Sequence, residues 1–391
     1  MFDRLFDNAV DRYGNALRLA VQDGRIARLA STGEALPAAE TVDLGGRLVL
    51  PGFVDGHIHL DKSFVGDRWQ PHLPAATLRE RLAIEKRLLA RSRPMAERAS
   101  ALIAQAAAFG TVAMRCHVDV DASTGLSHLH AVLEARERWR GIVDIEIVAF
   151  PQAGVVSCPG SAAVLEAAMR EGATVIGGID PTTFDGDAEA QLDVVFGIAE
   201  QYGSKVDIHL HEPGVQGVGQ LLRIAQRAKA LGMAGRVAVS HAYSLGEVPP
   251  EAVDRAARAL ADAGVAIMTN APGDRPFPPV LRLREAGVRV FAGSDNIRDA
   301  WWPYGNGDML QRAMLVGYRS GFYTDEHLHV ALDMVTHAGA EAIGQSGYGL
   351  AVGNEATFVV VDAPNGAAAV AGAPAGRLIV RCGEFERPAS A

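Results

Sequence analysis

Short apolar runs recur along the middle of the chain, and segments with apolar residues at helical spacing separate most of them. The runs are residues 53–57, 111–118, 145–150, 174–179, 206–210, 236–240, 265–269 and 288–292. The clearest helical segments are 95–109, 161–171, 188–202 and 218–231. Eight strand candidates that alternate with helices predict a (β/α)8 barrel of the TIM type over residues 51–349. A doubly wound sheet would alternate in the same way, but no glycine-rich phosphate loop follows the first run.

The two ends of the chain have a different pattern. Short strand-like segments, separated by glycine turns, occupy residues 18–22, 25–30 and 47–50, and similar segments recur at 356–361 and 377–380. A loose stretch rich in glycine, alanine and proline lies between the last two. We therefore expect residues 1–50 and 350–391 to pair into one small β-sandwich domain beside the barrel.

Composition excludes several classes of protein. The chain has 46 acidic and 37 basic residues and a formal charge of −9, which argues against binding to nucleic acid or to an anionic membrane. Cys116, Cys158 and Cys382 lie far apart, so neither a thiolate zinc site nor a disulfide framework is expected. No signal peptide or membrane-spanning stretch is recognisable. We expect a cytoplasmic protein whose partner is a small molecule, and the sequence leaves open whether it forms a homo-oligomer.

Polar residues follow the strand candidates at the end where barrel enzymes carry their catalytic groups. Six of the eight runs end in residues able to bind a metal or a substrate. These ends are residues 55–59, 115–119, 150–152, 207–212, 240–241 and 294–296. Such a distribution predicts a single site built from several strands.

Pairs of histidines two residues apart occur four times, as His57/His59, His128/His130, His209/His211 and His327/His329. The second and fourth pairs lie in helical segments, where residues two apart point to nearly opposite sides, so we expect surface or packing roles. In a strand the same spacing puts both side chains on one face. Spacing alone does not decide how His209 and His211 divide their roles.

A metal site is the simplest interpretation of these strand ends. His57, His59, His209 and Asp295 would supply three nitrogen ligands and one oxygen ligand to one divalent ion, with water completing the site. Imidazole and carboxylate ligands suit zinc or iron. The alternative for each residue is a hydrogen-bonded core or rim group.

Four segments, residues 51–62, 115–120, 149–154 and 294–309, resemble motifs of the amidohydrolase superfamily. They are most similar to the branch that contains bacterial cytosine deaminase and N-isopropylammelide isopropylamidohydrolase. The resemblance covers almost the whole chain.

The resemblance implies a role for each residue. His57, His59, His209 and Asp295 would bind one metal ion, because the fourth strand ends in residues 176–180 without the lysine or glutamate that bridges two metals. His241 would orient the attacking hydroxide, and Glu212 would shuttle protons to the ring nitrogen and the leaving amine. General chemistry agrees, since an amine is a poor leaving group until a nearby acid protonates it, and Asp295 can accept a proton from the attacking water.

Four further residues are expected at the substrate. Gln152 matches the position at which cytosine deaminase reads its pyrimidine, and its amide offers one acceptor and two donor hydrogens to a lactam edge. Trp301 would stack on a flat ring, and His117 and Asn296 would line the site. No role for Lys62 follows from the sequence.

Two departures from the branch leave the substrate open. Glu212 stands where the isopropylammelide enzyme has an aspartate, and Asn296 stands where cytosine deaminase has a second aspartate. We expect deamination of a cytosine-like, isocytosine-like or pterin-like lactam. The alternatives are removal of an alkylamine from a triazine, ring opening of a cyclic amide and, outside the enzymes, a catalytically inactive ligand-binding barrel.

Overall fold

The structure is a computed structural model that describes residues 1–75 and 78–386. The chain forms two compact units. One contains Met1–Val54, Ala106–Val112 and Asp308–Ala391, and the other contains Asp55–Gln105 and Ala113–Gly307. Every residue expected at the site belongs to the second unit.

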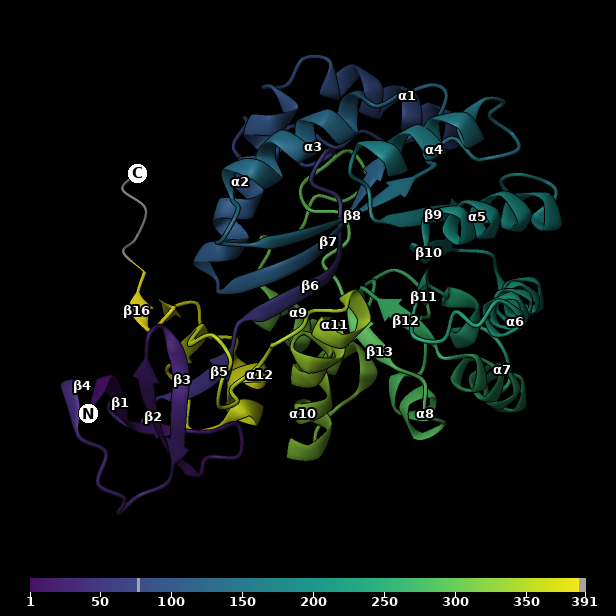
Figure 1. Cartoon of the computed structure of the whole chain (residues 1–391). Helices are drawn as coiled ribbons and strands as arrows, with labels where there is room; N and C mark the ends of the chain where they lie inside the picture. Colours follow the sequence, from purple (N-terminus) through teal and green to yellow (C-terminus); the bar gives the residue numbers. More distant parts are fainter. Residues whose placement is uncertain (76–77, 387–391) are drawn as a thin grey trace. The chain divides into compact units, whose positions relative to one another are not determined.

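The second unit is built on a parallel sheet of eight strands in the order β6 to β13 (Figure 1). The strands are β6 Phe53–Ile58, β7 Thr111–Asp119, β8 Asp144–Phe150, β9 Val175–Ile179, β10 Lys205–Leu210, β11 Val237–His241, β12 Val265–Thr269 and β13 Val290–Ala292. A bridge between Ile58 and Asp295 joins the two edges of the sheet, so the sheet closes into the predicted barrel. The carboxyl ends of all these strands therefore meet at one end of the barrel.

Helices connect the strands in the expected alternation. They are α1 Leu78–Leu89, α2 Met95–Ala108, α3 Ser127–Arg138, α4 Ser161–Glu171, α5 Ala188–Tyr202, α6 Gly214–Ala230, the 3₁₀ helix η1 Tyr243–Gly246, α7 Pro250–Ala263 and α8 Val280–Glu285. Helix α5 shows how local sequence sets the bounds: the Asp187 carboxylate caps its start, and Gly203 ends it at a φ of 63°. Helices α4 and α5 have the predicted bounds, whereas α6 begins four residues before the predicted 218.

The chain ends pair into one mixed sheet, as expected. Its strands are β1 Phe2–Val10, β2 Ala16–Gln22, β3 Arg25–Ala30, β4 Ala38–Asp43, β5 Leu48–Pro51, β14 Phe358–Val361, β15 Arg377–Arg381 and β16 Glu384–Phe385. The order is β16-β15-β14-β5-β1-β2-β3, with β4 on β1. Phe6 and Phe358, from opposite ends of the chain, meet edge to face with ring centroids 5.0 Å apart in a shared apolar core.

The same unit contains four helices, α9 Met309–Ser320, α10 Asp325–Met334, α11 His337–Ile343 and α12 Gly366–Gly372. The stretch predicted as a loose connection contains helix α12. The helix begins there because the Asn365 side chain accepts a hydrogen bond from the Ala368 amide and caps its first turn. The domain boundaries at residues 50 and 350 stay a prediction, since the compact unit itself reaches back to Asp308. Within the described part of the chain, no helix has the length and apolar character needed to cross a bilayer.

Candidate metal centre

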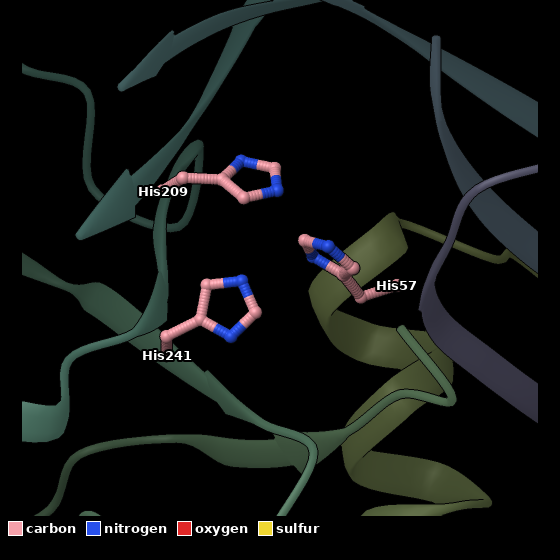
Figure 2. Close-up of side chains that lie close together, drawn as sticks. All are labelled: His57, His209 and His241. Atoms are coloured by element: carbon pink, nitrogen blue, oxygen red, sulfur yellow. The ribbon is translucent and has the colours of Figure 1, made fainter. Parts of the chain in front are cut away.

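Four imidazoles converge at the carboxyl ends of the barrel strands. His57 lies on β6, His209 on β10 and His241 at the end of β11, and Figure 2 shows their rings turned toward a common space. The His57 ring centroid lies 4.7 Å from that of His209, 5.1 Å from that of His241 and 5.3 Å from that of His59. All four side chains are buried.

Hydrogen bonds fix which nitrogen of His57 faces this space. The Ser240 hydroxyl donates to Oδ1 of the buried Asp207 at 2.7 Å, so its oxygen can only accept from His57 Nδ1, which lies 2.9 Å away. Arg115 donates to the other oxygen of Asp207 at 2.9 Å, which holds this carboxyl in place and counters the rise in its pKa that burial causes. His57 therefore carries its proton on Nδ1, and Nε2 is left with a lone pair.

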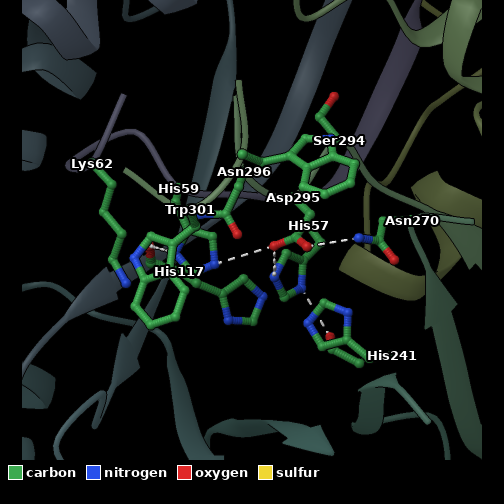
Figure 3. A network of polar contacts seen from close by, with 12 residues as sticks. His57, His59, Lys62, His117, His241, Asn270, Ser294, Asp295, Asn296 and Trp301 are labelled. Atoms are coloured by element: carbon green, nitrogen blue, oxygen red, sulfur yellow. Dashed lines mark hydrogen bonds and ion pairs between the residues drawn. The ribbon is translucent and has the colours of Figure 1, made fainter. Parts of the chain in front are cut away.

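His59 is oriented in the same way by a backbone group. Its Nδ1 lies 3.1 Å from the carbonyl oxygen of His117, which can only accept a hydrogen bond. The Nε2 atoms of His57 and His59 each lie 3.5 Å from Oδ1 of Asp295. The other Asp295 oxygen accepts a hydrogen bond from Asn270 Nδ2 at 2.7 Å, as Figure 3 shows. One carboxylate oxygen is thus anchored, while the other faces the two imidazoles.

The electrostatics favour neutral imidazoles at this centre. Burial lowers the pKa of His57 and His209 well below the usual value, and it lowers the pKa of His241 to about 3. Burial alone would raise the pKa of Asp295, but the neighbouring imidazoles, His241 first, hold it below its ordinary value. Neutral imidazole and ionised carboxylate are the forms that bind a metal ion.

The residues present fit a divalent ion. Among the described residues, His57 Nε2 and both ring nitrogens of His209 are buried without a hydrogen-bond partner, which is costly unless another ligand satisfies them. Ligand atoms of His57, His59 and Asp295 lie within 4.8 Å of one another, and so do those of His57, His209 and His241. The four expected ligands therefore come together around His57, and His241 stands beside them.

His241 is held by a chain of hydrogen bonds that the sequence did not reveal. Tyr243 donates its hydroxyl hydrogen to Asn270 Oδ1 at 3.3 Å, so the hydroxyl oxygen accepts from His241 Nδ1 at 3.2 Å. His241 has a left-handed backbone with a φ of 74°. The His211 ring stacks on the His241 ring, with ring centroids 4.6 Å apart. His211 Nδ1 in turn forms a hydrogen bond with Asp180 at 2.8 Å. His241 thus presents an unprotonated Nε2.

Glu212 follows β10 and is only 1% exposed. Its Oε1 accepts the backbone N–H groups of Thr182 and Thr183, each at 2.6 Å, and the Thr183 hydroxyl at 3.3 Å. Its Oε2 is buried without a hydrogen-bond partner. One oxygen is therefore fixed by the loop after β9, whereas the other has no hydrogen-bond partner within the described part of the chain.

The remaining expected residues divide between two places. His117 stacks on His57 with centroids 3.7 Å apart and has no hydrogen bond on either ring nitrogen, so it lies inside the histidine cluster. Gln152 and Trp301 lie around Lys62: the Lys62 Nζ atom is 2.5 Å from Gln152 Oε1 and 5.9 Å from the Trp301 ring centroid. Asn296 donates to Asp299 at 2.5 Å. Figure 3 shows Lys62 near the Trp301 ring.

Several functional contacts were missed from the sequence. Ser240, Asp207, Asn270 and Tyr243 all orient a histidine or Asp295. Asp207 and Ser240 lie in the polar strand ends 207–212 and 240–241, but the sequence assigned no role to them. The contacts of Ser240 with His57 and of Asn270 with Asp295 join residues 183 and 25 positions apart, and spacing along one strand cannot reveal them.

Comparison with known proteins places the chain in context. Residues 40–377 match the Amidohydrolase family. The chain is 34% identical to N-isopropylammelide isopropyl amidohydrolase of Pseudomonas sp. (strain ADP), covering 92% of this chain and 91% of that protein.

Two crystal structures are similar over nearly the whole chain. One is N-isopropylammelide isopropylaminohydrolase from Burkholderia multivorans ATCC 17616, with a TM-score of 0.92, 42% identity and 98% of each chain covered. The other is 5-methylcytosine deaminase from Klebsiella pneumoniae liganded with 5-fluorocytosine, with a TM-score of 0.86, 28% identity and 97% and 96% of the two chains covered.

Proposed function

This chain belongs to the amidohydrolase family, and we propose that it hydrolyses the bond between a ring carbon and an exocyclic amine on a small nitrogen heterocycle. One observation carries the proposal: the unprotonated Nε2 atoms of His57 and His59 both face Oδ1 of Asp295 at 3.5 Å. With His209, these residues form the ligand set for one divalent ion. An ion bound there would supply hydroxide near neutral pH by lowering the pKa of a water molecule.

Side chains of the protein accept and donate the protons of the proposed reaction. Asp295, itself a proposed ligand, and the unprotonated Nε2 of His241, beside the proposed ligand His57, can take a proton from the attacking water. Glu212 carries a proton on Oε2 to the leaving nitrogen, while the Thr182 and Thr183 amides hold Oε1 still. This transfer is needed because an unprotonated amine leaves poorly.

The ion is proposed to be zinc or iron. Three imidazoles and one carboxylate suit both metals, and availability often decides which of them occupies such a site. A single ion is proposed because Asp180, at the end of β9, already binds the His211 amide and ring.

The leaving group is proposed to be ammonia, with an alkylamine as the second candidate. Ammonia release is supported by the likeness to 5-methylcytosine deaminase liganded with 5-fluorocytosine, and by Glu212, a carboxyl that can protonate the leaving nitrogen. Alkylamine release is supported by the higher identity to the two isopropylammelide enzymes. Both reactions break the same kind of C–N bond.

A heterocycle panel tests the proposal. Protein loaded with Zn²⁺, Fe²⁺ or Mn²⁺ is incubated with cytosine, isocytosine, pterin and N-isopropylammelide, and ammonia and isopropylamine are measured separately. The Glu212→Gln variant should keep its metal and lose roughly 100-fold to 10,000-fold in kcat. Metal bound in every chain without release of either amine from any ring would contradict the proposal.

A further inference from the structure

Lys62 lies four residues beyond the end of β6 and is only 2% exposed, which is unusual for a lysine. Its ammonium nitrogen lies 2.9 Å from Oδ1 of Asp119 and 2.5 Å from Oε1 of Gln152. The ring centroids of Phe150 and Trp301 lie 5.5 and 5.9 Å from the same atom. The ammonium is therefore surrounded by one carboxylate, one amide oxygen and two aromatic rings.

These contacts fix the orientation of the Gln152 amide. An ammonium group has three donor hydrogens and no acceptor, so only the carbonyl oxygen of an amide can face it. A half-turn of the amide would set its NH₂ group against the ammonium and bring donors together. Gln152 thus uses Oε1 on Lys62 and is left with two N–H donors on Nε2.

The pair lies next to the metal centre. Phe150, which contacts Lys62, stacks on His209 with ring centroids 4.0 Å apart. Trp301 is fixed on the other side, because its indole nitrogen donates to Oε1 of the buried Glu85 at 2.7 Å. Only the Phe150 ring therefore separates Lys62, and Gln152 bound to it, from the proposed metal ligand His209, so a heterocycle bound at the centre is within reach of Gln152.

We propose that Lys62 is a positioning residue: it holds the Gln152 carbonyl oxygen, so that Gln152 can only donate hydrogen bonds to the substrate ring. The ring position that faces Gln152 then carries an oxo group, which accepts a hydrogen bond, in preference to an amino group, which cannot. This inference rests on the proposed function, since it assumes a heterocycle at this site. It changes what the sequence suggested, because a free glutamine amide could read either edge of a lactam.

The preference for oxygen should be large. A site built to hydrogen-bond one group discriminates strongly against an analogue that leaves its buried polar atoms unpaired. An amino group at this position would also place donor against donor. We expect the oxo ring to bind at least about tenfold more tightly than the matched amino ring.

The test uses two small rings that differ in one substituent and are uncharged at neutral pH, pyrimidin-2-one and 2-aminopyrimidine. Their dissociation constants are measured by calorimetric titration into metal-loaded wild type, Lys62→Met, Gln152→Glu and the exposed control Lys229→Met. Wild type and control should prefer the oxo ring by about tenfold or more. Lys62→Met should reduce the preference to within about threefold, because the amide is then free to turn.

Gln152→Glu provides the sharpest outcome. One carboxylate oxygen would pair with Lys62 and the other would accept, so the preference should reverse toward 2-aminopyrimidine. Metal content and melting temperature, measured in parallel, show whether each variant is folded.

Wild type that binds both rings equally, prefers the amine or binds neither would overturn the inference. A folded Lys62→Met variant that keeps the wild-type preference would also overturn it. Binding is measured without turnover, so these results stand apart from the amine-release assay. A protein with the predicted ring preference and no amine release would keep the inference and contradict only the proposed reaction.

Discussion

At the scale of single residues, a hydrogen bond at Nδ1 of His57 and of His59 sets the protonation and orientation of each imidazole, so that Nε2 can bind a metal ion. The Nδ1–H group of His57 donates a hydrogen bond to the Ser240 hydroxyl, and that of His59 donates one to the His117 carbonyl. Both anchors can only accept in these positions, so both imidazoles must present a lone pair on Nε2. This arrangement orients the rings before a metal arrives and makes them better bases.

The Ser240 hydroxyl gives the clearest test of this arrangement. Ser240→Ala should weaken metal binding by about 10-fold to 100-fold, because His57 loses the partner that sets its protonation and ring angle. Metal affinity is measured by competition with a chromophoric chelator. Ser127→Ala, which removes an exposed hydroxyl bonded to the Thr124 carbonyl, is the matched control. Equal affinity in the Ser240 variant and wild type would show that the bond does not orient a ligand.

At the scale of elements, one carboxylate holds the loop that follows β8 and carries Gln152. Asp185 accepts backbone hydrogen bonds from Val155, Val156 and Ser157 at about 3.0 to 3.2 Å, and Gln191 donates to it from helix α5 at 2.8 Å. Burial alone would raise the pKa of Asp185, but the Ser157 hydroxyl, which donates at 2.6 Å, together with these donors holds it below the usual value. The loop is therefore tied to α5 through an ionised side chain.

This tie predicts a pH-dependent contribution to stability. Because the folded-state pKa of Asp185 is lowered, its contribution is present above the unfolded-state pKa of about 3.9 and is lost as the pH falls through the folded-state value. Asp185→Asn should cost about 1 kcal/mol at pH 7, a modest figure because the group is only partly buried, and less at pH 3.5. Urea unfolding at both pH values measures the difference. The exposed control Asp193→Asn should show little cost, and an Asp185 effect that grows on acidification would contradict the sign.

The sequence predicts the barrel strands well because their side chains are buried. All eight barrel strands were found to within two residues at each end, because their apolar runs are buried on both faces. Strands β1, β4 and β16 were missed, since β4 and β16 are largely exposed and β1 is interrupted by polar residues and a left-handed Asn8. Two groups of ligand atoms that share His57, one with His59 and Asp295 and one with His209 and His241, lie at these strand ends, and the metal-binding role of these residues stays a prediction. The contact of Lys62 with Gln152 joins residues 90 positions apart, and no periodicity encodes it.

At the scale of the whole molecule, metal and folding should be linked. An ion that binds the folded chain and not the unfolded chain adds about 4 kcal/mol of stability at a free concentration 1,000 times its dissociation constant. Removing the metal with a chelator should therefore lower the melting temperature, and adding Zn²⁺ back should restore it. Asp295→Ala should melt at the same temperature with and without the chelator. A chelator effect of the same size in that variant would place the stabilising ion elsewhere.

Long-range contacts also hold distant parts of the chain together, and Arg377 on β15 is the strongest example. Its guanidinium is fully buried and pairs with both oxygens of Asp308, each at 2.7 Å. It also donates to the Phe109 carbonyl at 3.0 Å, and the Phe53 and Phe109 rings lie 5.5 Å from it. One side chain thus binds segments that begin far apart in the sequence, all within one compact unit.

Breaking this pair should destabilise the fold far more than breaking a surface pair. Arg377→Met removes the buried guanidinium that binds both oxygens of the Asp308 carboxylate, which is 4% exposed, and we expect a loss of about 3–5 kcal/mol in the free energy of unfolding. Asp308 also caps helix α9 through the Leu310 amide, so its orientation is retained in the variant. Arg170→Met, which removes an exposed pair with Glu166, should cost less than about 1 kcal/mol. Denaturant unfolding of both variants measures the difference, and equal losses would mean that the buried pair contributes no more than the surface one.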